Sequence, residues 1–205
     1  FRSWAGTVAD VRAERDRHDG RAARIGVARW QEGDLHLRLN LWIKDVATGA
    51  ERQLTSDGVK DFGYATSNAG WTTSAAASLS WSPDSKKIAT QQQDERQVGD
   101  MYLVETPVNG GHPVLKAWKY PLPGDPVVAM MERVVIDVDS GKITRLKMPR
   151  DFHRAMSEDN IDMTEYLWSP DGAQLGFVST DRFHKNSTAK VADTNTGDVR
   201  RSEEH

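Results

Sequence analysis

The fold is decided by a stretch that occurs twice: Leu-Ser-Trp-Ser-Pro-Asp-Ser-Lys-Lys-Ile-Ala at residues 79–89, and Tyr-Leu-Trp-Ser-Pro-Asp-Gly-Ala-Gln-Leu-Gly-Phe at residues 166–177. In each copy an apolar segment ends at Trp. Ser-Pro-Asp then suits a tight turn, because proline presets φ and aspartate bonds back to the backbone. A second apolar segment follows at once. Each copy therefore predicts a β-hairpin, with Trp81 and Trp168 at equivalent core positions.

A second repeat predicts another hairpin. It reads Leu-Trp-Ile-Lys-Asp-Val-Ala-Thr-Gly-Ala-Glu-Arg-Gln-Leu at residues 41–54, Val-Val-Ile-Asp-Val-Asp-Ser-Gly-Lys-Ile-Thr-Arg-Leu at 134–146, and a weaker copy lies at 189–200. Each strand ends at Asp and turns at Thr-Gly or Ser-Gly, so we expect positive φ at Gly49, Gly141 and Gly197. An early and a late hairpin together make a four-stranded antiparallel meander, which is a β-propeller blade.

The spacing of the repeats indicates about three blades. Trp81 and Trp168 lie 87 residues apart, whereas a propeller blade takes about 40–50 residues. Glycine and proline are frequent in residues 102–131 and exclude continuous central strands there. We therefore expect one blade with a long insertion.

The expected architecture is an all-β partial β-propeller. Its four-stranded antiparallel blades are placed at about residues 25–58, 79–146 and 166–201, after a charged arm or helix at 1–24 and before a tail at 202–205. Because a closed propeller needs at least about four blades, we expect an open arc whose exposed blade edges allow self-association.

Composition excludes several classes of function. The 205 residues carry a net charge of −3 with both signs interspersed, which argues against a nucleic-acid surface. The chain has no cysteine, so disulfides, thiolate metal sites and a cysteine nucleophile are ruled out. The six histidines show no ligand spacing, and no apolar run approaches a membrane span. We expect no metal, no cofactor, no nucleic-acid partner and no membrane span.

Three stretches carry a family resemblance. They are Leu-Thr-Ser-Asp-Gly at 54–58, Trp-Ser-Pro-Asp at 81–84 followed by Gln-Asp-Glu-Arg-Gln-Val at 93–98, and Tyr-Pro-Leu-Pro-Gly at 120–124 before the strand at 134–137. In order and spacing, over about residues 40–180, they resemble the N-terminal β-propeller of dipeptidyl-peptidase-IV-like serine peptidases of the prolyl oligopeptidase family. The Tyr-Pro-Leu-Pro-Gly segment is the most specific of the three.

The resemblance implies a function for the parent protein. In that family the propeller caps a C-terminal α/β-hydrolase domain and selects the peptides that reach it, so the implied partners are a peptide substrate and that domain. The hydrolase needs a Gly-x-Ser-x-Gly elbow, and this sequence has none. We therefore expect no catalytic residue and no activity in this chain alone. A periplasmic or secreted location is expected, with a cytoplasmic one left open.

Two other functions stay open. One is a binding or scaffold propeller of the bacterial cell envelope with no enzyme attached, and the other is an inactive relative that serves as an interaction module. A serine elbow encoded downstream would favour the peptidase.

Six residues are candidate substrate contacts. The family holds the peptide's α-ammonium with paired glutamates placed before the Trp-Ser-Pro blade, where charge-assisted hydrogen bonds are strong. Residues 60–74 here contain one acid, Asp61, and no pair, so we expect weaker selection for a free N-terminus. For Glu95 and Arg96 a solvated blade loop is the alternative. The candidates are Asp61, Tyr64, Asn68, Trp71, Glu95 and Arg96.

Overall fold

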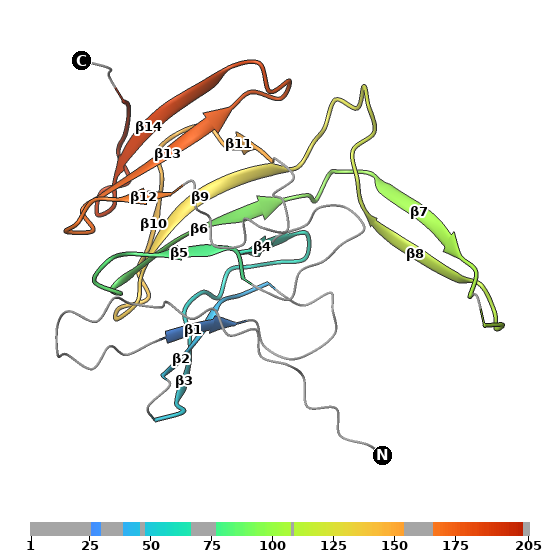
Figure 1. Ribbon diagram of the computed structural model, residues 1–205, viewed down its shortest axis with the longest axis horizontal. Helices are drawn as coiled ribbons and strands as arrows, with labels where there is room; N and C mark the ends of the chain where they lie inside the picture. Colours follow the sequence, from blue (N-terminus) through green and yellow to red (C-terminus); the bar gives the residue numbers. More distant parts are fainter. Residues whose placement is uncertain are drawn as a thin grey trace.

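The computed structural model describes residues 26–29, 39–45, 48–66, 77–107, 109–153 and 166–202. All regular structure in these ranges is β, arranged as three antiparallel sheets and one separate two-stranded hairpin (Figure 1). The sheets lie one after another in chain order and do not close into a barrel. An all-β partial propeller is therefore confirmed. The predicted arm at 1–24 lies outside the described residues.

The first sheet has the order β1-β2-β3, with strands Gly26–Arg29, Trp42–Asp45 and Glu51–Gln53. The third sheet has the order β12-β13-β14-β15, with strands Leu167–Trp168, Gln174–Thr180, Ser187–Asp193 and Val199–Arg201. Both are meanders in which each strand pairs with the next along the chain, as the two sequence repeats predict.

The central sheet is built on two eight-residue strands, β6 (Lys87–Asp94) and β9 (Met130–Asp137), which pair along their whole length. Each outer edge is made of two short strands. On the β6 side these are β4 (Phe62–Tyr64) and β5 (Leu79–Trp81). On the β9 side they are β10 (Ile143–Arg145) and β11 (Asp151–Phe152).

The predicted insertion lies between β6 and β9. It contains a hairpin of β7 (Asp100–Glu105) and β8 (Val114–Lys119), which pair with each other and with no other described strand. Figure 1 shows this hairpin projecting away from the three sheets. The inserted residues thus form strands of their own outside the blade.

The turn chemistry follows the sequence. Gly49, Gly141 and Gly197 have φ of 74°, 72° and 78°, which confirms the predicted positive φ. At the Ser-Pro-Asp turn the hydroxyl of Ser82 and the amide of Lys86 both donate to Oδ1 of Asp84 (2.7 and 3.1 Å). These bonds stay within a few residues, so the turns form locally.

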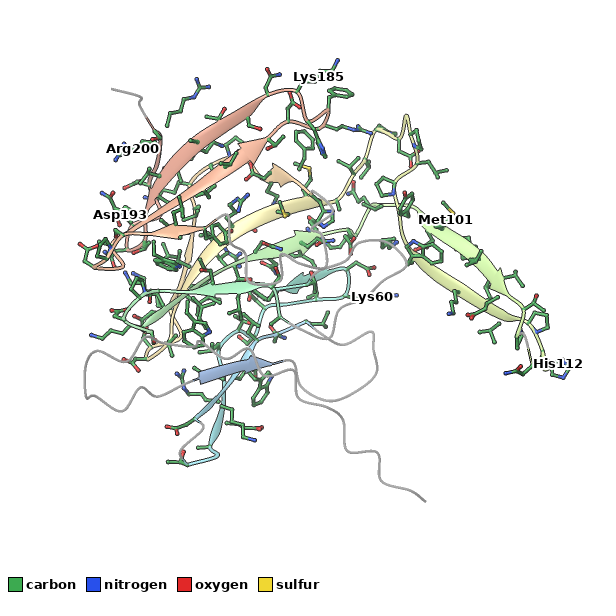
Figure 2. All side chains as sticks on the ribbon, viewed as in Figure 1. Lys60, Met101, His112, Lys185, Asp193 and Arg200 are labelled. Atoms are coloured by element: carbon green, nitrogen blue, oxygen red, sulfur yellow. The ribbon has the colours of Figure 1, made fainter. Side chains whose placement is uncertain are left out.

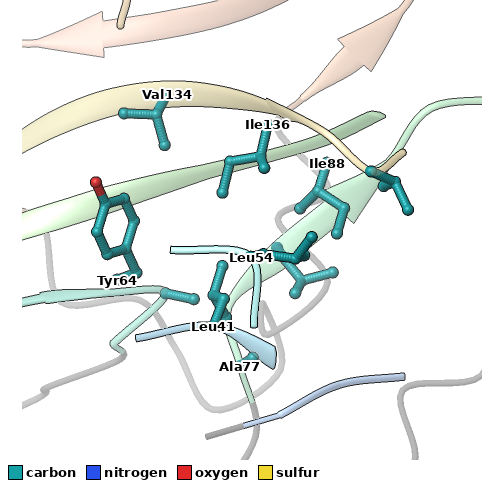
Figure 3. Close-up of a cluster of buried hydrophobic side chains, with 10 residues drawn as sticks. Leu41, Leu54, Tyr64, Ala77, Ile88, Val134 and Ile136 are labelled. Atoms are coloured by element: carbon teal, nitrogen blue, oxygen red, sulfur yellow. The ribbon is translucent and has the colours of Figure 1, made fainter. Parts of the chain in front are cut away.

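Two hydrophobic clusters join the three sheets. The first packs Leu41 and Leu54 against Ile88 and Ile136, between the first and central sheets (Figure 3). The second lies between the central and third sheets and consists of Ala89, Val135, Leu146, Tyr166, Leu175, Phe177 and Ala192. The side chains of β6 and β9 alternate between the two clusters, so the central sheet is covered on both faces.

The two repeat tryptophans take equivalent places. Trp81 pairs with Ile88 and packs on the first cluster, and Trp168 pairs with Leu175 and packs on the second. Among the described residues no helix is long and apolar enough to cross a membrane.

Candidate functional site

Three of the predicted site residues lie together where β4 begins and β6 ends. The two strands are antiparallel with Phe62 opposite Asp94, so the residue before β4 meets the residues after β6. The amide of Glu95 donates a hydrogen bond to the carbonyl oxygen of Asp61 (2.7 Å), and Arg96 follows. In Figure 1 this point lies on the side of the central sheet from which the hairpin projects. We call it the strand-end site.

The backbone of Asp61 is held in a tight turn. Its φ is 59°, a left-handed conformation that aspartate tolerates better than most residues with a side chain. Val59 and Phe62 close the turn with two backbone hydrogen bonds of 3.2 and 2.9 Å. The position of Asp61 is therefore set by local geometry on one side and by the backbone of Glu95 on the other.

Asp94 holds two arginines, and both guanidiniums lie over the ring of Phe62. Its carboxylate accepts two bonds from Arg96, at 2.8 Å from Nε and 2.7 Å from a terminal nitrogen, and one from Arg150 at 2.6 Å. The two guanidinium carbons lie 4.4 and 5.0 Å from the ring centroid of Phe62. The hydrogen bonds from Arg96 lower the pKa of Asp94 to about 2, so this carboxylate stays ionised at neutral pH.

The ion pairs continue from Arg150 toward the first sheet. Arg150 and Arg145 each lie 3.4 Å from a carboxylate oxygen of Glu132, and Arg145 also pairs with Asp57 at 2.6 Å. Positive and negative side chains therefore alternate over six residues, which we call the charge ladder. Its members are, in order, Asp57, Arg145, Glu132, Arg150, Asp94 and Arg96.

Tyr64 lies in the core and reaches the ladder with its hydroxyl. Its side chain is fully buried. The hydroxyl donates to Asp57 (2.7 Å) and accepts from Arg145 (3.1 Å). Burial and the hydrogen bond to the carboxylate raise the pKa of Tyr64 well above its usual value. This residue packs between the first and central sheets.

The Leu-Thr-Ser-Asp-Gly loop is fastened to the segment before β2. The hydroxyl of Thr55 accepts from the amide of Leu41 (2.9 Å), and Oδ1 of Asn40 accepts from Thr55 and from the amide of Gly58 (3.1 and 3.0 Å). A Cβ on Gly58 would lie 1.9 Å from the carbonyl oxygen of Leu39, so only glycine fits. The motif positions the carboxylate that begins the charge ladder.

A buried arginine joins the central and third sheets. Arg133 donates to Asp151 (2.7 Å), to the hydroxyl of Tyr166 (2.8 Å) and to the carbonyl oxygen of Val178 (3.2 Å). Its guanidinium also stacks on Phe177, 4.7 Å from the ring centroid. No turn or motif in the sequence marks this network, because its partners are far apart along the chain.

A polar cleft of about 140 Å³ lies at the opposite end of β6, lined by residues that include Asp137 and Lys142. The ammonium of Lys87 donates there to Thr194 (2.7 Å), Asn195 (2.8 Å) and the carbonyl oxygen of Gly172 (3.4 Å). Its three protons are all engaged, so Lys87 fastens two sheets together.

Asn68 and Trp71 lie outside the described residues. Within the described ranges no group of three or more His, Asp or Glu side chains could hold a metal ion. Sequence reasoning missed Phe62 and Arg150, and nothing in their local sequence singles them out.

Comparisons with known proteins agree on one family. Residues 37–205 match the dipeptidyl peptidase IV N-terminal region. A search of curated proteins finds no match.

Solved structures give the same fold. A candidate dipeptidyl aminopeptidase IV from Bacteroides ovatus superposes with a TM-score of 0.58 at 16% identity, over 78% of this chain and 20% of that one. Porphyromonas gingivalis dipeptidyl peptidase 4 gives 0.60 at 16% identity, over 80% and 22%. The chain therefore spans about a fifth of the length of these structures. At this identity the likeness shows the fold alone.

Proposed function

The chain belongs to the dipeptidyl peptidase IV N-terminal region family, and we propose from that premise that it is the propeller portion of a serine peptidase. In this proposal the propeller gates and selects peptides for a C-terminal α/β-hydrolase domain. The family match over 37–205 is the observation that carries it. The same premise favours a periplasmic or secreted location.

The strand-end site supplies the chemistry for selection. The sequence offers no adjacent acidic pair before the Trp-Ser-Pro blade, but the fold brings Asp61 beside Glu95 through a backbone hydrogen bond of 2.7 Å. In this proposal two carboxylates from residues next to the ends of β4 and β6 take the place of an adjacent pair from one loop. We propose that they hold the α-ammonium of a bound peptide, since a hydrogen bond between an ammonium and a carboxylate is about twice as strong as one between neutral groups.

The test uses the full-length gene product and a peptide with a free or an acetylated N-terminus. We expect Asp61→Asn and Glu95→Gln each to lower the ratio of kcat/KM for the free over the acetylated peptide by about tenfold, as loss of one charged hydrogen bond implies. Asp139→Asn, at an exposed turn, is the matched control. An unchanged ratio in both variants would refute the ammonium site.

This chain alone is expected to be inactive. It contains no Gly-x-Ser-x-Gly elbow, so no serine is presented beside backbone oxyanion donors. Purified chain should therefore leave dipeptide arylamides uncleaved. Cleavage that survives repurification and stops with a serine-directed inhibitor would contradict the proposal. A full-length product that contains no hydrolase elbow would favour the scaffold alternative.

Self-association is part of the same proposal. Strands β3 and β15 each pair with one other strand among the described strands, and the edge of a sheet is a surface on which another copy can pair. We expect the apparent mass in light scattering to rise with concentration. A compact monomer at every concentration would count against it.

A further inference from the structure

The tip of the β7–β8 hairpin carries the one asparagine of this sequence that is followed by glycine. Asn109 and Gly110 lie between the two strands, and both are exposed. Figure 2 labels His112, two residues further along, at the outer end of the hairpin. Asparagine before glycine is prone to lose its side-chain amide, because glycine has no side chain to shield its backbone nitrogen from the asparagine.

The two groups that would react are free to meet. Neither the side chain of Asn109 nor the amide of Gly110 makes a hydrogen bond to the described residues. A Cβ on Gly110 would have nothing within 4 Å. Gly110 and Gly111 have φ of 83° and 128°, and two successive glycines give a turn wide backbone freedom. The backbone nitrogen of Gly110 can therefore turn toward the side-chain carbon of Asn109.

The other described asparagines lack this freedom. Oδ1 of Asn195 accepts a hydrogen bond from the ammonium of Lys87 (2.8 Å). The next backbone amide, that of Thr196, donates to Asp193 (2.9 Å), so the nitrogen that would attack is also held. The side chains of the remaining two are held by hydrogen bonds as well, at Asn40 and Asn186.

We propose that Asn109 is a site of spontaneous deamidation. The backbone nitrogen of Gly110 loses its proton and forms a bond to Cγ of Asn109. The C–N bond of the side-chain amide breaks, and its nitrogen leaves as ammonia with that proton. Water then opens the cyclic succinimide at either carbonyl carbon, which gives aspartate or isoaspartate. Water is the only co-reactant, so the step needs no enzyme, cofactor or oxidant.

The change is confined to the hairpin. Either product adds one negative charge to a chain whose net charge is −3, and isoaspartate also lengthens the backbone by one methylene group. Strands β7 and β8 pair with no other described strand, so the three sheets should keep their stability. The urea midpoint of the deamidated chain should therefore equal that of the fresh chain. A lower midpoint would contradict this confinement.

The experiment incubates the whole 205-residue chain in water labelled with heavy oxygen, at neutral and at mildly alkaline pH. Peptide mapping by mass spectrometry then follows each asparagine. We expect the peptide that contains Asn109 to exchange its amide nitrogen for one labelled oxygen. The reaction should be faster at the higher pH, because the attacking nitrogen must lose its proton.

Asn109→Gln should abolish the product at this position, because the longer glutamine side chain would have to close a larger ring. The loop peptide Pro-Val-Asn-Gly-Gly-His-Pro, which copies residues 107–113, is the reference for an unrestrained backbone. If Asn109 stays intact in the folded chain after this peptide has reacted completely, the proposal is wrong.

Thr196→Gly is the matched control. It gives Asn195 the same following sequence as Asn109, Gly-Gly, at a place where both reacting groups are held. The folded variant should react at Asn109 and keep Asn195 intact, whereas the same variant unfolded in urea should react at both. Equal reaction at both positions in the folded variant would overturn the role of the unrestrained hairpin tip.

Discussion

Two strand pairs from one stretch of chain are alike in their antiparallel pairing and differ in how deeply their side chains are buried. Strands β6 and β9 pair over eight residues, and β7 and β8 pair over six, both in unbroken antiparallel register. The first pair is buried on both faces, with Ile88 and Ile136 fully inaccessible. In the second, Tyr102 and Leu115 are each 62% exposed. Both pairs thus have regular backbone pairing, but only the side chains of β6 and β9 are buried.

The difference teaches what stabilises this fold. Backbone hydrogen bonds exchange protein for water partners and contribute little net free energy, whereas burial of a large apolar side chain contributes about 1.5–3 kcal/mol. An isolated two-stranded hairpin is marginal in water. We therefore expect the central pair to withstand denaturant that frees the hairpin, and four substitutions test this from the largest effect downward.

The largest effect is expected from the ion pairs. Arg133 and Asp151 form a buried pair on the central sheet, and Lys116 and Glu105 form an exposed one on the hairpin. Asp151→Ala leaves a buried guanidinium uncompensated and should lower the free energy of unfolding by about 3–5 kcal/mol. Lys116→Gln should cost below about 1 kcal/mol. Urea denaturation measures both, and similar losses would refute the contrast.

Apolar truncation gives the next effect. Ile136→Ala opens a cavity in the first cluster and should cost about 2–5 kcal/mol. Leu115→Ala removes a similar volume from the exposed hairpin and should change stability by about 0.5 kcal/mol or less. Urea denaturation measures both losses as shifts of the midpoint, with the slope of the free energy of unfolding against urea concentration unchanged. A loss above about 1 kcal/mol for the hairpin variant would mean that a partner covers it.

Gly49 and Gly197 have similar backbone conformations but different surroundings, so alanine variants of the two distinguish a steric clash from backbone strain. A Cβ at Gly197 would lie 2.4 Å from the carbonyl oxygen of Arg145, whereas nothing lies within 4 Å of one at Gly49. Both have positive φ, so each alanine variant pays about 1–2 kcal/mol of backbone strain. Gly197→Ala should cost about 1–2 kcal/mol more, since the neighbouring sheet must shift. Equal melting temperatures for the two alanine variants would show that the backbone near Arg145 moves aside at no cost in stability.

The smallest effect is a pH dependence. Asp94 has a pKa of about 2 in the folded chain, below the value of about 3.9 for an unfolded aspartate. Its ionised form therefore stabilises the fold above about pH 4, and this contribution is lost as pH falls toward 2. The melting temperature of Asp94→Asn should lie slightly below that of the wild type at pH 7 and converge with it near pH 2. A constant difference would contradict this.

Part of the site could be predicted and part could not. The sequence could single out Asp61, Glu95 and Arg96, because they stand beside recognisable turns and strand ends. The sequence could not predict that these residues lie together, since this depends on the pairing of β4 with the C-terminal end of β6. Arg150 and Phe62 were missed because a stacked arginine leaves no periodic or turn signal in a sequence.

The sequence by itself determined the hairpins, the repeated blade and the family. Turn residues act within four or five positions, so the positive φ of Gly49, Gly141 and Gly197 follows from local chemistry. The tertiary structure decided which strands share an edge, that Arg133 is buried, and that six charges from three segments form one ladder. Such contacts join residues up to 88 positions apart, as Arg145 and Asp57 do. Local propensity carries no information about them, because burial against a neighbouring sheet selects them.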